Sequence, residues 1–245
     1  MMSEEFWWSH CGLFYDAGQR SKFVRNIHAA FFKNVDALNL PFGSKALDAG
    51  CGTGSSTFPL AKRGFDVLGV DFGRSVLNRA VWLNATKYGF PNVDFRLMDL
   101  SKRFPVEDET FDFVGSLHCI MKIDGVDVTL REFHRVLKPQ GKVVISTTPD
   151  SYTITEWLRR YIRKHGLART LWDIRWLVVW AIPYFVFTER SERRHEHRWG
   201  EEAFSEHLRL AGFKTLHMER VPYINVGCII GVFEKEERAV EPGLE

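Results

Sequence analysis

A glycine-rich segment, ALDAGCGTGSST at residues 46–57, carries residue types that could contact a charged ligand. An acid, Asp48, ends a short apolar run, and three glycines follow it at every second position: Gly50, Gly52 and Gly54. Glycines allow positive φ angles and let the backbone approach a ligand closely. The helix expected after them offers free N–H groups to negatively charged ligand atoms. The segment is typical of a turn that binds a nucleotide-like ligand.

Two further acids follow later apolar runs. Asp71 comes after residues 66–70, about 20 residues past the glycines, where an acid can accept hydrogen bonds from both hydroxyls of a ribose. Asp99 follows residues 93–98, where it could accept a hydrogen bond from a purine amino group while Leu100 packs on the ring. The two acids and the glycines together predict a ligand that contains a nucleoside.

NAD is an alternative ligand, because its fingerprint is GxGxxG or GxGxxA. Counted from Gly50, the third position is Ser55, and counted from Gly52 it is Thr57. Neither register supplies the closely packed third glycine, so NAD is the weaker interpretation. A nicotinamide-dependent oxidoreductase stays open as an alternative function.

Short apolar runs alternate with helical stretches along most of the chain. This alternation predicts a parallel sheet with helices on both faces. The expected strands are 45–48, 66–70, 93–98, 111–117, 142–147, 213–220 and 224–233. The expected helices are 21–38, 57–63, 75–88, 126–137 and 201–211.

The order of these motifs resembles that of class I S-adenosylmethionine-dependent methyltransferases. LDAGCGTG is similar to the family's first motif, and GVDFGRSVLNRA is similar to the second-strand motif with its ribose acid. LMDLSKRFPVEDETFDFVGSLHCI resembles the third-strand acid and the fourth strand, and EFHRVLKPQGKVVIST resembles the approach to the fifth strand. The resemblance covers roughly residues 44–148. It implies an α/β Rossmann-like fold with a seven-stranded, mostly parallel sheet, helices on both faces and an α-helical insertion after strand five.

The resemblance also implies roles for the matching positions, with S-adenosylmethionine as cofactor and S-adenosylhomocysteine as product. The glycines would pass under the methionine part, with Asp48 close to its amino group. Asp71 would hold the ribose hydroxyls and Asp99 would meet the adenine amino group. The implied cofactor-binding residues are Asp48, Gly50, Cys51, Gly52, Gly54, Asp71, Phe72, Asp99, Leu100 and Leu117.

His118 follows the fourth expected strand and is the candidate catalytic residue. The methyl group of this cofactor is already activated, so a base is needed only when the acceptor is protonated. Imidazole has a pKa suited to proton transfer near neutrality. The alternative is a histidine that only packs or hydrogen-bonds in its loop.

The residues after the fourth strand bear on the acceptor. Family members that methylate exocyclic amines of DNA bases carry a DPPY-type motif there, and cytosine-carbon enzymes use a Pro-Cys nucleophile. This chain has Ser116-Leu117-His118-Cys119 instead, and it lacks the paired-glutamate loop of arginine methyltransferases. These departures favour a small-molecule acceptor over a macromolecule.

We interpret residues 1–245 as a single domain. Its expected parts are N-terminal cap helices (1–43), a cofactor-binding core (44–148), a helical lid insertion (149–199) and a C-terminal helix with strands (200–245). The insertion holds five of the eight tryptophans and ten of the 33 Lys and Arg residues. It predicts a lid over a hydrophobic acceptor, a membrane contact through residues 155–195, or plain packing.

Four side chains are candidate acceptor contacts. In similar methyltransferases the segment before the first strand closes over the ligands, so His10 would reach the acceptor and Tyr15 would cover the cofactor. The alternative is that the aromatic residues of this segment only pack the N-terminus against the core. Trp176 and Trp180 belong to the expected lid. A quinone, an isoprenoid or a polyketide would suit such aromatic surroundings.

The composition limits the other function classes. The net charge is only +2, so nucleic acid is not expected as a partner. The four cysteines are scattered and form no CxxC pair, so no metal site is expected. The apolar stretch 174–187 is too short to span a membrane, which favours a cytoplasmic protein with peripheral membrane contact left open. The sequence does not indicate an oligomeric state.

The main hypothesis is therefore a methyltransferase that transfers a methyl group directly, in line, to a small and hydrophobic or aromatic acceptor. The second hypothesis is a catalytically inactive binding module with the methyltransferase fold, associated with a membrane or a partner.

Overall fold

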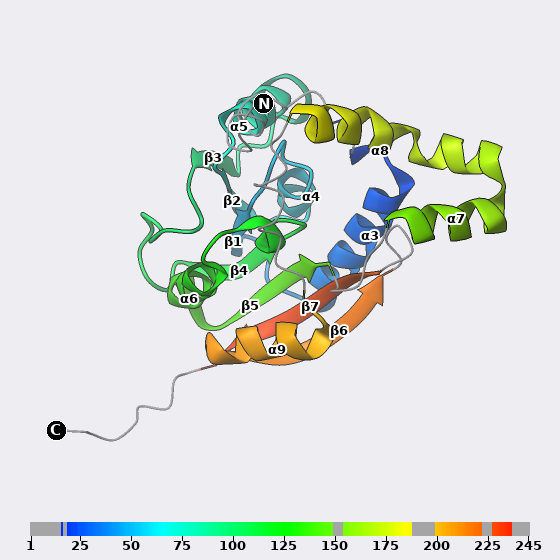
Figure 1. Cartoon of the computed structure of the whole chain (residues 1–245). Helices are drawn as coiled ribbons and strands as arrows, with labels where there is room; N and C mark the ends of the chain where they lie inside the picture. Colours follow the sequence, from blue (N-terminus) through cyan, green and yellow to red (C-terminus); the bar gives the residue numbers. More distant parts are fainter. Residues whose placement is uncertain (1–15, 17–18, 149–153, 188–198, 222–226, 237–245) are drawn as a thin grey trace.

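Seven strands form one sheet in the order β3–β2–β1–β4–β5–β7–β6 (Figure 1). The computed structural model describes residues 16, 19–148, 154–187, 199–221 and 227–236. Every neighbouring pair is parallel except those of β7, which runs antiparallel to β5 and β6. The strands are Lys45–Ala49 (β1), Asp66–Asp71 (β2), Val93–Leu97 (β3), Phe111–Ser116 (β4), Leu137–Thr147 (β5), Phe213–Val221 (β6) and Cys228–Lys235 (β7). The predicted Rossmann-like sheet and the helical insertion after β5 are confirmed.

The helices follow the expected alternation. They are Lys22–Ala37 (α3), Thr57–Lys62 (α4), Arg74–Leu83 (α5), Val126–Val136 (α6), Ile154–His165 (α7), Leu167–Phe187 (α8) and Glu201–Leu210 (α9). Three boundaries differ from the prediction by four residues or more, and one of them is the start of β7, which is at Cys228 rather than at residue 224. The helix expected at 75–88 ends at Leu83 and continues as a π-helical turn, Asn84–Tyr88. Strand β5 begins at Leu137 rather than at residue 142, because Leu137 pairs with Phe111 across a bulge.

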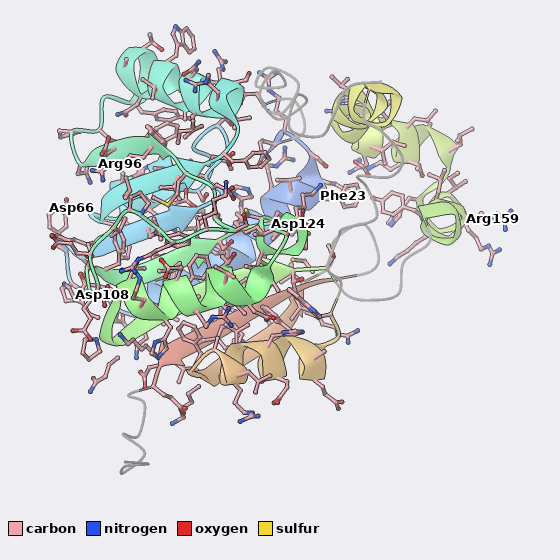
Figure 2. The ribbon with its side chains drawn as sticks, turned by 60° about the vertical axis from the view of Figure 1, so that its left-hand side comes forward. Phe23, Asp66, Arg96, Asp108, Asp124 and Arg159 are labelled. Atoms are coloured by element: carbon pink, nitrogen blue, oxygen red, sulfur yellow. The ribbon has the colours of Figure 1, made fainter. Side chains whose placement is uncertain are left out.

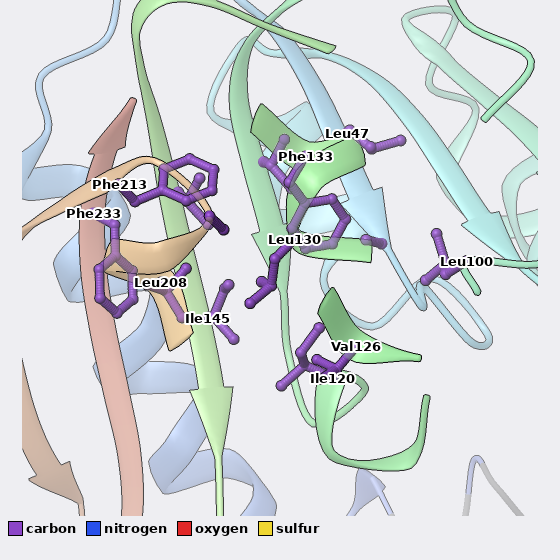
Figure 3. Packing of buried hydrophobic residues seen from close by; sticks show 14 of the residues in the cluster. Leu47, Leu100, Ile120, Val126, Leu130, Phe133, Ile145, Leu208, Phe213 and Phe233 are labelled. Atoms are coloured by element: carbon purple, nitrogen blue, oxygen red, sulfur yellow. The ribbon is translucent and has the colours of Figure 1, made fainter. Parts of the chain in front are cut away.

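Alternate strand residues fill two cores, one on each face of the sheet. On β1, Leu47 belongs to the core under α6 and α9, whereas Ala46 belongs to the core under α3 and α4. Figure 3 shows the first core, where Phe133 of α6 and Leu208 of α9 lie against the sheet. The carboxyl ends of the parallel strands are thus held in fixed relative positions by packing on both faces.

Helices α7 and α8 form an extension beside the sheet (Figure 1). Buried polar contacts tie this extension to the first residue of α3. Lys22 Nζ lies 2.5 Å from Asp173 Oδ2, and the Tyr161 hydroxyl donates to the same oxygen at 2.9 Å. Burial opposes ionisation, but hydrogen bonds from Lys22, Tyr161 and Arg169 outweigh it and lower the pKa of Asp173 to about 2. Within the described helices, none is both long and apolar enough to span a membrane.

Candidate functional site

The glycine-rich turn lies between β1 and α4, at the carboxyl end of the sheet. Its three glycines have positive φ angles, 78° at Gly50, 54° at Gly52 and 87° at Gly54. A Cβ atom at Gly50 would lie 2.1 Å from Cys119 Sγ, so no side chain fits there. The turn therefore depends on glycine both for its backbone conformation and for the close approach of Cys119.

The carboxylate of Asp48 stabilises the turn through hydrogen bonds. It is fully buried, and its carboxylate accepts hydrogen bonds from Ser56 Oγ at 2.8 Å and from Thr57 Oγ1 at 2.6 Å. Burial raises the pKa of Asp48 to about 6, although the hydrogen bonds from Thr57 and Ser56 oppose the shift. The sequence analysis missed Ser56 and Thr57. The signal that could have identified them is the pair of small hydroxyl residues at the start of the helix that follows the glycines. Direct contact of Asp48 with a cofactor stays a prediction.

Asp71 ends β2 and joins two neighbouring loops. Its Oδ2 accepts a hydrogen bond from the Gly52 N–H at 3.0 Å, and its Oδ1 accepts one from the Gly73 N–H at 2.8 Å. Burial raises the pKa of Asp71, whereas these backbone donors favour the charged form. Each carboxylate oxygen can accept a second hydrogen bond, so the group can still receive ligand hydroxyls.

An open surface lies beside Asp71 at the ends of β2 and β3. Phe72 is 47% exposed, and Asp99 is also exposed. Asp99 accepts hydrogen bonds from Ser101, and although burial opposes the shift, these bonds and those from Lys102 lower its pKa. Leu100 is buried in the core that contains α6, so its side chain supports the fold, and packing on a purine stays a prediction.

The residues after β4 lie next to the turn. Leu117 is buried in the core under α3 and α4. His118 has a φ angle of 57°, uncommon for a residue with a side chain, and its N–H donates to Ser146 Oγ at 2.7 Å. Non-glycine residues held in this region concentrate at functional sites. The Ser146 contact was not predicted, because it depends on the register between β4 and β5.

The cysteines of the site are unsuited to nucleophilic chemistry. Burial raises the pKa of Cys51 and of Cys119, and the nearby carboxylates of Asp48 and Asp71 raise both further. A thiol must lose its proton to act as a nucleophile or metal ligand. In the part of the chain that the structure describes, no group of three His, Cys, Asp or Glu side chains could hold a metal ion.

Four predicted acceptor contacts cannot be placed. His10 and Tyr15 lie outside the described residues. Trp176 and Trp180 lie on α8, but their side chains are outside the described part of the structure. All four contacts stay predictions.

Residues 47–145 match a family model described as a methyltransferase domain. This match covers β1 through most of β5 and includes both acids and the glycine-rich turn. Residues 47–145 form a methyltransferase domain of the class I, S-adenosylmethionine-dependent fold. The order of motifs expected from the sequence is thereby confirmed, and NAD loses its support as the ligand.

Curated relatives of the methyltransferase domain have different acceptors. Phosphoethanolamine N-methyltransferase 3 of Arabidopsis thaliana is 36% identical over 139 residues, which is 54% of this chain and 27% of the relative. Demethylmenaquinone methyltransferase of Streptomyces griseus is 36% identical over 124 residues, 48% of this chain and 51% of the relative. The chain thus spans about half or less of the length of these relatives.

Solved structures extend the similarity of fold beyond the methyltransferase domain's motifs. A 1,6-didemethyltoxoflavin-N1-methyltransferase of Burkholderia thailandensis, with bound 1,6-didemethyltoxoflavin and S-adenosylhomocysteine, aligns with a TM-score of 0.61 at 18% identity. The alignment covers 91% of this chain and 82% of that enzyme. At this identity, the likeness establishes the fold alone.

The residues of the methyltransferase domain fit S-adenosylmethionine, the cofactor of this family. The turn at Gly50 forms a cradle that a Cβ would fill, and Asp71 and Phe72 offer a carboxylate and an exposed ring beside it. Among the described side chains, Ser116 Oγ and Thr147 Oγ1 are buried without a hydrogen-bond partner at the carboxyl ends of β4 and β5. Buried polar atoms of this kind are expected to find a partner.

Proposed function

We propose that the chain is an enzyme that methylates a small, hydrophobic or aromatic acceptor with S-adenosylmethionine, by direct in-line transfer. The observation that carries the proposal is the contact between Asp71 and the Gly52 N–H, inside a segment that matches a methyltransferase domain. The contact places the proposed ribose acid against the turn that would receive the methionine part. The comparisons constrain the acceptor less than the cofactor, because the relatives are named for different acceptors.

The cofactor, when bound, supplies the activated methyl group. In this proposal the chain's residues bind and orient it. The carboxylate of Asp71 accepts hydrogen bonds from the ribose hydroxyls, and the carboxylate of Asp99 accepts one from the adenine amino group. Phe72 covers the adenine, and the glycine-rich turn offers its backbone to the methionine part. Leu117, Leu100 and Cys51 support this surface from the cores in which they are buried.

His118 is the proposed base for a protonated acceptor. Its backbone is fixed in the left-handed region by the hydrogen bond to Ser146, at the carboxyl end of β4. Open α/β sheets bind their ligands at this end. The imidazole would remove a proton from the acceptor as the new bond to carbon forms. A positioned base contributes about 10²–10⁴-fold to the rate of such a step.

The acceptor class is supported by the helical insertion and by one relative. Helices α7 and α8 follow β5 and hold Trp176 and Trp180, which we propose as lid residues with His10 and Tyr15. The relative from Streptomyces griseus is named for demethylmenaquinone. Peripheral contact of residues 155–195 with a membrane would suit this acceptor class, since a hydrophobic acceptor dissolves in lipid, but the proposed activity does not depend on it.

Methyl-labelled cofactor tests the proposal. The protein is incubated with labelled S-adenosylmethionine and an extract of the source cells, and the organic, aqueous and macromolecular fractions are separated. Label in the organic fraction is the expected result. Transfer of label to the macromolecular fraction alone would overturn the acceptor class, and label that stays entirely in unreacted S-adenosylmethionine would contradict the activity.

A further inference from the structure

Helix α8 carries a row of exposed apolar side chains along one side. Its members are 38–61% exposed: Leu167, Leu171, Trp172, Val178 and Val179. Leu167, Leu171 and Val178 are spaced by four, seven and eleven residues, close to whole turns of a helix. Trp172 and Val179 lie about 100° further round, so the five side chains form one broad face. We call this row the α8 apolar face. Monomeric proteins rarely leave such a face uncovered without a partner.

The helices that carry this face are basic. Residues 154–187 contain six Lys or Arg and only two acids, although the whole chain has a net charge of +2. One of the two acids, Asp173, is buried and forms ion pairs with Lys22 and Arg169, so the charge of Arg169 is balanced and the excess of basic residues comes from the rest of the two helices. On α7, Arg159, Arg163 and Lys164 are exposed, and Figure 2 shows Arg159 pointing outward, away from the sheet.

An aromatic and a cationic side chain meet on the α8 apolar face. The Arg175 guanidinium lies 3.8 Å from the centroid of the Trp172 ring, and that ring is 61% exposed. Tryptophan favours the boundary between water and hydrocarbon, and arginine can extend its charged end to the lipid phosphates from there. The pair therefore suits the headgroup region of a bilayer.

We propose that the α8 apolar face, with the basic side chains of α7, docks on the surface of an anionic lipid membrane. Three charged residues, Arg169, Asp173 and Arg175, interrupt α8, so the helix is suited to lie along the surface rather than to cross it. Apolar burial and attraction to anionic lipid add in such interfacial helices. The basic surroundings favour lipid over a second copy of this chain, because two copies would bring like charges together.

The buried contacts of Asp173 fix the orientation of this face. Lys22 begins α3, Tyr161 lies on α7 and Asp173 lies on α8, so one cluster joins three helices. Phe23 packs edge-on against Tyr161 with ring centroids 5.6 Å apart. Docked helices would therefore hold the whole methyltransferase domain at the membrane. The inference rests on the proposed function only where it explains how a lipid-soluble acceptor is reached.

Vesicle co-sedimentation of the full chain, without cofactor, tests the inference. Vesicles of phosphatidylcholine are compared with vesicles that also contain phosphatidylglycerol. Wild-type protein is expected to bind the mixed vesicles, and Leu171→Glu with Val178→Glu is expected to weaken binding at least about tenfold. Arg159→Glu with Arg163→Glu is expected to weaken binding to the anionic vesicles alone.

The matched control is Leu210→Glu with Leu216→Glu, which changes exposed apolar residues on α9 and β6, outside the insertion. This variant is expected to bind as the wild type does. Equal binding of the α8 and control variants, or no binding by wild type, would overturn the inference. So would a dimer that depends on the α8 apolar face and forms without lipid.

A parallel melting measurement with S-adenosylhomocysteine separates this inference from the proposed function. If the ligand stabilises the wild-type protein but the protein does not bind vesicles, only the membrane inference is contradicted. Protein that binds vesicles but not the ligand contradicts only the proposed enzyme.

Discussion

The carboxylate of Asp71 and the backbone N–H of Gly52 are joined by a hydrogen bond of 3.0 Å. The bond connects the end of β2 to the glycine-rich turn after β1, across the carboxyl edge of the sheet. A second backbone donor, the Gly73 N–H, fixes the other oxygen of the same carboxylate at 2.8 Å. One side chain thus sets the distance between the two loops that would hold opposite ends of the cofactor.

Replacing Asp71 by Ala is expected to weaken S-adenosylhomocysteine binding by about 10- to 100-fold, because hydrogen bonds to a charged group contribute about 1.5–3 kcal/mol. Isothermal titration calorimetry measures the affinity. Asp66→Asn is the matched control, since Asp66 is an exposed acid at the opposite end of β2. Equal affinities of the Asp71 variant and wild type would remove Asp71 from the site.

Replacing Gly50 by Ala is expected to destabilise the fold more than Gly43→Ala does. Both glycines have a positive φ, 78° and 82°, so both variants are strained by about 1 kcal/mol. Only at Gly50 would the new Cβ collide, at 2.1 Å from Cys119 Sγ, whereas Gly43 faces open space. Urea denaturation measures both free energies of unfolding.

Shortening Cys119 to Ala is not expected to rescue Gly50→Ala, because the Cβ of Cys119 would still lie 2.4 Å from the new atom. Rescue by Cys119→Ala would show that the sulfur atom alone causes the collision. Equal losses at Gly43 and Gly50 would show that close packing does not constrain the turn.

Replacing His118 by Gln is expected to slow turnover of a protonated acceptor about 100-fold or more while cofactor affinity stays within about twofold. A step that needs a deprotonated base has a rate that rises with pH, and the variant should lack such a rise if His118 is that base. His217→Gln is the control, because His217 is an exposed histidine on β6. Wild-type turnover in the His118 variant, with the same pH profile, would reject the base role.

Replacing Asp173 by Asn is expected to lower the free energy of unfolding at pH 7 by about 2 kcal/mol. The pKa of Asp173 is depressed to about 2 from 3.8, so its contribution is present above pH 3.8 and is lost as the pH falls towards 2. Urea denaturation at pH 7 and at pH values below 3.8 should therefore show the difference between variant and wild type shrinking.

Asp94→Asn removes an exposed carboxylate paired with an exposed arginine, Arg96, and should change stability by less than about 1 kcal/mol. A difference between Asp173→Asn and wild type that is independent of pH would contradict the assigned ion pair.

The strands and most helices could be predicted because their signals are local. The run before Asp48 and the glycines after it define β1 and the turn within a few residues. The start of β5 at Leu137 could not be predicted, because it depends on pairing with Phe111 on another strand.

The site was predictable in part, for the same reason. Asp71 and Asp99 lie at the strand ends where the sequence places them. The partner of His118, Ser146, comes from the neighbouring strand β5. The contact of Lys22 with Asp173 joins residues 151 positions apart, and only the folded position of the insertion creates it. The division of residues 1–245 into one domain with a lid stays a prediction.

Titration calorimetry of the wild-type protein with S-adenosylhomocysteine, and separately with NAD, tests the central claim most directly. We expect one site for S-adenosylhomocysteine, an affinity that falls about 10- to 100-fold in Asp71→Ala but not in Asp66→Asn, and no binding of NAD. Binding of NAD without binding of S-adenosylhomocysteine would contradict the account.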